Sequence, residues 1–169
     1  LFIELGADEE LLDFPVVYQD FEQDVYDSLI DGLDLLQKYT RLIMIYPGGK
    51  EPEGRMIGFK RFCDEKGFQS EIIRSVVNKE MKKGEAYFVP SDRNLVRLVK
   101  MASEKNLQLG TDAGIVSFND TVLKEVVAGG ITTISTDFQL MGQTLARMIQ
   151  ERSTDKIRNR SSLIRRNSL

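Results

Sequence analysis

The chain has 169 residues, of which 41% are hydrophobic and 29% charged, enough apolar content for one packed domain or two small lobes. Its 23 basic and 26 acidic side chains give a net charge of −3, which argues against a nucleic-acid-binding surface on this chain alone. No apolar run approaches the roughly 20 residues that span a bilayer, so we predict no contact with a membrane.

The first half of the chain is predicted to alternate short strands with amphipathic helices. In chain order the expected elements are a strand at 14–19, a helix at 25–39, a strand at 41–46, a helix at 53–65 and a strand at 68–73. The run at 41–46 is apolar almost throughout, which is typical of a strand buried on both faces.

The second half continues the alternation. The expected elements are a strand at 86–89, a helix from Ser91 to about Lys105, a strand at 115–118, a helix at 121–127, a strand at 131–135 and a helix ending near Glu151. The last helix opens with Thr136-Asp137-Phe138-Gln139, the spacing of a capping box. Strands and helices joined by short connections predict an α/β fold with a parallel sheet.

Several classes of catalytic site are disfavoured by the composition. The chain contains no histidine, which removes the commonest general base and metal ligand. It has no GxSxG elbow, no Rossmann glycine fingerprint and no complete phosphate-binding loop. We therefore predict that it is not an enzyme and has neither metal nor cofactor. Cys63 is the only cysteine, which excludes an internal disulfide and fits the reducing cytoplasm.

Polar side chains follow the predicted strands at the positions where parallel sheets bind ligands. Asp20, Arg55, Ser91 and Asn119 lie just after four different strands. Carboxylate, guanidinium and amide groups suit sugar hydroxyls, which both donate and accept hydrogen bonds, and an aromatic side chain such as Phe138 could cover a sugar ring. Helix capping alone also explains Ser91 and Asn119, and a solvated side chain explains Arg55.

The segment 114–149 and the ending SLIRRNS resemble the effector-binding domain of lactose/galactose-type bacterial repressors. A strand ending in Phe-Asn-Asp, an Ile-Thr-Thr-Ile strand, a helix with a Met-Gly pair and a final Leu-Ile-x-Arg strand follow in the same order as in that family. The resemblance implies a two-lobed, periplasmic-binding-protein-like α/β fold with parallel sheets. Residues 1–38 and 133–157 would form the N-terminal lobe, which lacks its opening strands, and 39–132 and 158–169 the C-terminal lobe.

The resemblance also implies roles for single residues. The segment GRMIGF is similar to the Arg-x-x-Gly-Phe segment whose arginine holds the effector, so Arg55 is expected to bind the ligand. Asp20, Ser91, Asn119 and Phe138 match ligand-contacting positions as well. Asn119 stands where aspartate is usual and Ser91 where asparagine is frequent, so the hydrogen bonds to the ligand should differ from the common pattern.

The function implied by the resemblance is ligand sensing in a cytoplasmic bacterial transcriptional regulator. A sugar or sugar derivative would bind between the lobes, and a DNA-binding head preceding Leu1 would respond to it. The resemblance further implies a homodimer. A periplasmic sugar-binding protein of a transport system has the same fold and is the alternative, and an enzyme on a doubly wound sheet is a third, less favoured one.

Overall fold

The structure, a computed structural model, describes residues 2–4 and 14–169 and contains two separate β-sheets. The smaller sheet is entirely parallel and has the order β1 (Phe2–Glu4), β2 (Val16–Tyr18), β8 (Lys156–Arg158). The larger has the order β4 (Gln69–Ile73), β3 (Arg41–Ile45), β5 (Glu85–Val89), β6 (Gly114–Phe118), β7 (Thr132–Thr136), β9 (Ser161–Ile164). Only β9 is antiparallel to its neighbour in the larger sheet.

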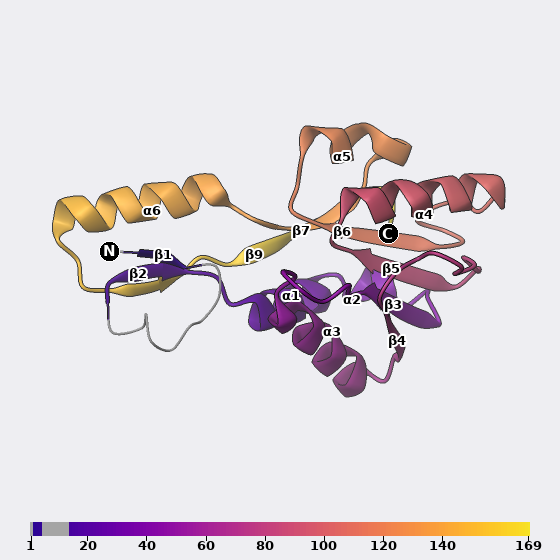
Figure 1. The fold of residues 1–169 in the computed structure, drawn as a ribbon, viewed down its shortest axis with the longest axis horizontal. Helices are drawn as coiled ribbons and strands as arrows, with labels where there is room; N and C mark the ends of the chain where they lie inside the picture. Colours follow the sequence, from indigo (N-terminus) through magenta and orange to yellow (C-terminus); the bar gives the residue numbers. More distant parts are fainter. Residues whose placement is uncertain (1, 5–13) are drawn as a thin grey trace.

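Helices cover both faces of the larger sheet and one face of the smaller, and the two sheets lie end to end in an elongated molecule (Figure 1). They are α1 (Phe21–Asp31), α2 (Leu33–Leu36), α3 (Glu53–Lys66), α4 (Asp92–Glu104), α5 (Val122–Val126), the 3-10 segment η2 (Val127–Gly129) and α6 (Phe138–Glu151). We call the larger sheet with α1–α5 and η2 the larger lobe, and the smaller sheet with α6 the smaller lobe.

The core of the larger lobe forms on both faces of its sheet, because consecutive strand residues point in opposite directions. On β3, Leu42 and Met44 join the cluster beneath α1 and α3, whereas Ile43 and Ile45 join the one beneath α4. All four are fully buried. The expectation of a strand buried on both faces at this position is confirmed.

Helices α1 and α3 approach so closely that a side chain is excluded from one position. A Cβ atom built on Gly58 of α3 would lie 2.1 Å from the carbonyl oxygen of Glu22 in α1. Val25 and Leu29 of α1 share a buried cluster with Phe59 of α3. The first helix therefore belongs to the larger lobe by packing, although it directly follows a strand of the smaller one.

The boundary between the lobes consequently differs from the one that the resemblance implied. We expected 1–38 and 133–157 in the smaller lobe, but α1 and α2 pack on the larger sheet and β7 is one of its strands. The chain crosses between the lobes at 19–20, at 137 and at 159–160.

The α/β class and the parallel sheets are confirmed. The helix expected at 25–39 is divided at Gly32 into α1 and α2. The sequence reasoning predicted neither β1 nor β8. No helix among the described residues is long and apolar enough to cross a bilayer.

Candidate functional site

The candidate site lies at the edge of the larger sheet that faces the smaller lobe. Strands β3, β5, β6 and β7 are parallel, so their carboxyl ends share this edge, and the chain crosses to the smaller lobe there (Figure 1). Ligands of open parallel sheets bind beyond this end of the strands. Asp20 follows β2 of the smaller sheet, and the other four predicted site residues follow strands of the larger sheet, namely Arg55 after β3, Ser91 after β5, Asn119 after β6 and Phe138 after β7.

Arg55, on the first turn of α3, lies between two aromatic rings. Its guanidinium carbon lies 4.7 Å from the ring centroid of Phe118 and 5.2 Å from that of Phe21. Its Nη1 donates to Glu51 Oε1 at 2.6 Å, and its side chain is only 11% exposed. The other N–H groups of this guanidinium make no hydrogen bond to a described residue, so they are available to a ligand oxygen.

Asp20 caps the first turn of α1, next to the ring that covers Arg55. Its Oδ1 accepts a hydrogen bond from the backbone N–H of Gln23 at 3.0 Å. One carboxylate oxygen of Asp20 therefore has a capping role. Phe21, which follows Asp20 in the chain, contacts Arg55 through its ring, so the beginning of α1 lies against Arg55.

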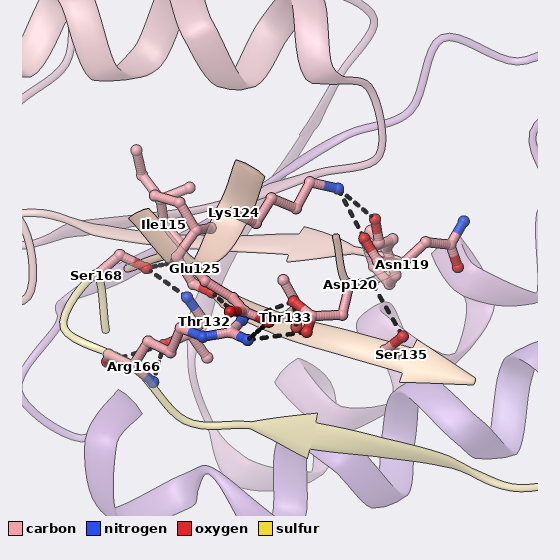
Figure 2. Close-up of polar contacts among 12 residues, drawn as sticks. Ile115, Asn119, Asp120, Lys124, Glu125, Thr132, Thr133, Ser135, Arg166 and Ser168 are labelled. Carbon is pink, nitrogen blue, oxygen red and sulfur yellow. Dashed lines mark hydrogen bonds and ion pairs between the residues drawn. The ribbon is translucent and has the colours of Figure 1, made fainter. Parts of the chain in front are cut away.

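Asn119 forms the tight turn after β6, with its side chain exposed. Its φ of 61° is left-handed, a conformation that asparagine tolerates better than most residues. The backbone N–H of Asn119 donates to the carbonyl of Ile134, and Lys124 Nζ donates to the carbonyls of Phe118 and Asn119, both at 2.8 Å (Figure 2). The turn is thus fixed by its backbone, and the exposed amide side chain makes no hydrogen bond within the described part of the chain.

Ser91 caps α4 after β5, and a buried lysine links its segment to the Asn119 turn. The hydroxyl of Ser91 accepts from the backbone N–H of Asn94 at 3.3 Å, so it too has a capping role. The adjacent Asp92 lies 3.2 Å from the ammonium of Lys124, a residue that is 3% exposed. Lys124 therefore holds the segments that follow β5 and β6 against each other.

Asp120 points away from this edge and has a structural role. Arg166 holds its carboxylate with two hydrogen bonds, of 2.6 and 2.8 Å, and the hydroxyl of Thr133 donates a third at 3.0 Å (Figure 2). The guanidinium of Arg166 keeps the pKa of the Asp120 carboxyl below its usual range. This pair joins the turn after β6 to the segment that follows β9.

Phe138 differs from the other four because it lies in the smaller lobe. It is the first residue of α6, its side chain is 56% exposed, and the preceding Asp137 caps the helix by accepting from the N–H of Leu140. Its part in a site shared with the other four residues stays a prediction.

Sequence reasoning missed the residues that organise the edge. Phe21 and Phe118 enclose Arg55, Glu51 holds its guanidinium, and Lys124 fixes the Asn119 turn. The two ring contacts join distant parts of the sequence, so no local pattern indicates them, whereas Glu51 and Lys124 lie within five residues of their partners. Among the described residues, no group of cysteine, aspartate and glutamate side chains is arranged to hold a metal ion.

The arrangement is suited to binding an uncharged or anionic polar molecule. A guanidinium between two rings offers directed N–H donors, a nearby carboxylate offers acceptors, and a hydroxyl and an amide offer both. Enclosure by aromatic rings lowers the local dielectric and strengthens such hydrogen bonds.

Residues 35–168 match a family model described as a periplasmic-binding-protein-like domain. No curated protein sequence matches the chain significantly. Three solved structures illustrate the similarity of fold. A lac repressor dimer bound to operator and the anti-inducer ONPF has 19% identity and a TM-score of 0.69, over 92% of this chain and 53% of that one.

A transcription regulator from Lactobacillus plantarum has 19% identity and a TM-score of 0.70, over 99% of this chain and 71% of that one. A LacI-family transcriptional regulator from Arthrobacter sp. FB24, in complex with lactose, has 13% identity and a TM-score of 0.73, over 98% and 70%. The chain thus spans about half to two thirds of the length of such structures.

Proposed function

Since the chain belongs to the family of periplasmic-binding-protein-like domains, we propose that it is the ligand-sensing part of a bacterial transcriptional regulator. A small molecule binds between the two lobes and changes their relative orientation. A DNA-binding head elsewhere in the protein responds to that change, which is a coupling of two sites through a two-state element. The observation that carries the proposal is the enclosed Arg55, whose guanidinium lies between two aromatic rings and makes one hydrogen bond, from Nη1, to the described residues.

The ligand is a sugar or sugar derivative, because the candidate residues offer the groups that neighbouring hydroxyls need. Arg55 donates, Asp20 accepts, and Ser91 and Asn119 do both. Phe138, contributed by the smaller lobe, covers the apolar face of the ring when the lobes close. The Arthrobacter regulator with bound lactose supports this class of ligand.

The activity is binding without catalysis. The candidate residues include no nucleophile paired with a base, and the chain has no histidine to act as one. The solved structures of similar fold that are described above are transcription regulators, which also supports a binding role.

A transport protein with the same fold is the rival, and the regulators among the similar structures favour a cytoplasmic sensor over it. The sensor works as a homodimer. Three apolar side chains on α5 support self-association, since Val122, Leu123 and Val126 are 78%, 59% and 70% exposed. Sedimentation of the full-length protein as a monomer at micromolar concentration would contradict the dimer.

The experiment that tests the function is a ligand screen on the full-length protein. Monosaccharides, disaccharides and their phosphorylated or acidic derivatives are added one at a time, and the melting temperature is measured. A ligand at 100 times its dissociation constant should stabilise the folded state by about 2.7 kcal/mol. The same ligand should change the affinity of the protein for DNA carrying its own upstream sequence. If a ligand raises the melting temperature but the protein binds no DNA with or without that ligand, the result would favour the transport protein.

A further inference from the structure

Hydrogen bonds join the three chain crossings between the lobes to one another. The side-chain amide of Gln19 donates to the hydroxyl of Thr136, which joins the first crossing to the second. Asn159 donates from its side chain to the carbonyl of Asp137 at 3.1 Å and from its backbone to the carbonyl of Tyr18 at 2.8 Å. These contacts define a compact hinge, and Gln19 and Asn159 are almost completely buried within it.

Beside this hinge, one ion pair connects the two lobes directly. Arg158 lies at the end of β8 in the smaller lobe, and its Nη2 donates to Asp24 Oδ1 at 2.6 Å. Asp24 lies on α1 in the larger lobe and is 2% exposed. The same nitrogen reaches Asp27 Oδ2 at 3.3 Å, and the hydroxyl of Ser161 donates to Asp24 Oδ2 at 3.2 Å.

From this geometry we propose that Arg158 is a positioning residue that limits twisting and separation of the two lobes through its ion pair with Asp24. A buried carboxylate without a cation is strongly unfavourable, and Arg158 is the only cation paired with Asp24 in the described part of the chain. Any rotation that separates the lobes at this point leaves the Asp24 carboxylate in the interior without its partner.

The position of the pair indicates what it restrains. Arg158 immediately precedes the crossing at Asn159, and Asp24 lies on the first turn after the crossing at 19–20. Groups this close to a hinge are displaced little when the lobes close. The ion pair therefore restricts twisting and separation of the lobes, and it permits closure about the hinge. This inference rests on the proposed function in one respect, namely that closure of the lobes reports the binding of a ligand.

The lobe orientation is measured without any ligand, by electron–electron double resonance on the full-length protein. Spin labels are placed at Lys100→Cys on α4 and Arg147→Cys on α6, both exposed positions in different lobes. The native Cys63 is buried, and burial raises the pKa of its thiol to about 12, so it reacts slowly with the label.

We expect Asp24→Asn to broaden or displace the interlobe distance distribution relative to the labelled parent. Arg158→Met removes the cation instead and should give the same result. Arg158→Lys should give an intermediate distribution, because a single nitrogen holds both carboxylates and a lysine ammonium replaces part of that contact. Asp34→Asn is the matched control, since it breaks an exposed ion pair with Arg165 within the larger lobe and should leave the distances unchanged.

Distances equal to those of the parent in Asp24→Asn, or in Arg158→Met if the first variant does not fold, overturn the proposal. An equal broadening in the Asp34→Asn control also overturns it, because the effect would then be one of general destabilisation. A ligand screen that finds no ligand, together with altered distances in Asp24→Asn, contradicts the proposed function and supports the positioning role.

Discussion

Arg166 holds Asp120 with two parallel hydrogen bonds, Nη1 to Oδ1 at 2.6 Å and Nη2 to Oδ2 at 2.8 Å (Figure 2). Both side chains are about four-fifths buried. Arg166→Ala leaves the Asp120 carboxylate without its counter-charge and should lower the free energy of unfolding by about 2 kcal/mol or more. Urea denaturation measures the loss. Arg165→Ala is the control, since its exposed pair with Asp34 should contribute less than about 1 kcal/mol.

The same pair should make the stability depend on pH in the acidic range. Arg166 lowers the pKa of Asp120, so the carboxyl stays ionised in the folded protein at pH values where the unfolded chain takes up a proton. Its contribution is complete above the ordinary aspartate pKa of about 4 and is lost as the pH falls through the lower folded value. Between pH 7 and pH 3, the free energy of unfolding measured by denaturation should decline less in Asp120→Asn than in the wild-type protein. Parallel curves for wild type and variant would contradict this assignment.

Gly58 should tolerate no side chain, because the Glu22 carbonyl occupies the place of its Cβ atom. Gly58→Ala must separate α1 from α3 and should destabilise the protein by about 1–3 kcal/mol. Gly142→Ala in α6 is the matched control, since nothing lies within 4 Å of its Cβ position. That variant should be neutral or stabilise the protein by up to about 1 kcal/mol. Thermal unfolding of both variants tests the close approach, and equal melting temperatures would refute it.

Arg55→Ala should weaken effector binding about 10- to 100-fold, because a charged hydrogen bond contributes about 1.5–3 kcal/mol. Arg55→Lys should not restore the affinity, since an ammonium lacks the planar array of N–H groups that lies between the two rings. Calorimetry with the ligand from the screen gives the affinities, and Arg147→Ala on the exposed surface of α6 is the control. Unchanged affinity in Arg55→Ala would exclude Arg55 from the site.

Lys124→Met should loosen the segments after β5 and β6 together, because the ammonium contacts Asp92 and the carbonyls of Phe118 and Asn119. Hydrogen–deuterium exchange should become faster around these residues. Lys100→Met, on the exposed side of α4, should change neither segment. Faster exchange confined to α5 would show that Lys124 only stabilises its own helix.

Local patterns were sufficient to predict the alternating strands and helices of the larger lobe. The apolar run of β3 and the cap at Ser91 are encoded within a few residues of each element. The capping-box spacing instead put the cap of the last helix at Thr136, whereas the structure has it at Asp137. The lobe to which α1 belongs was not predictable in this way, because it depends on the contact between Gly58 and Glu22. The strand β8 was missed because its three residues are polar or half-buried and acquire their pairing only from β2.

The sequence predicted which types of residue form the candidate site and where they stand in the chain, but it did not predict most of the contacts that these residues make. Arg55 was identified from its segment, but its environment comes from Phe21 and Phe118, which lie far from it in the sequence. In the sequence, Asp120 and Asn119 are adjacent polar residues that both follow β6. The structure distinguishes their roles, because Arg166 binds the carboxylate of Asp120. The ligand roles of Asp20, Arg55, Ser91, Asn119 and Phe138 therefore remain predictions that the binding measurements address.

The pairing of β2 with β8 has a consequence for how the chain folds. Val16 pairs with Lys156, so the smaller sheet joins the two ends of the described chain and has a high contact order. Closing so long a loop is slow compared with forming local helices and the neighbouring strands of the larger sheet. During synthesis, β2 leaves the ribosome long before β8, so the edge of β2 that pairs with β8 stays unpaired until β8 has been translated. The larger lobe should therefore fold first, and the smaller sheet should be the segment most dependent on chaperones.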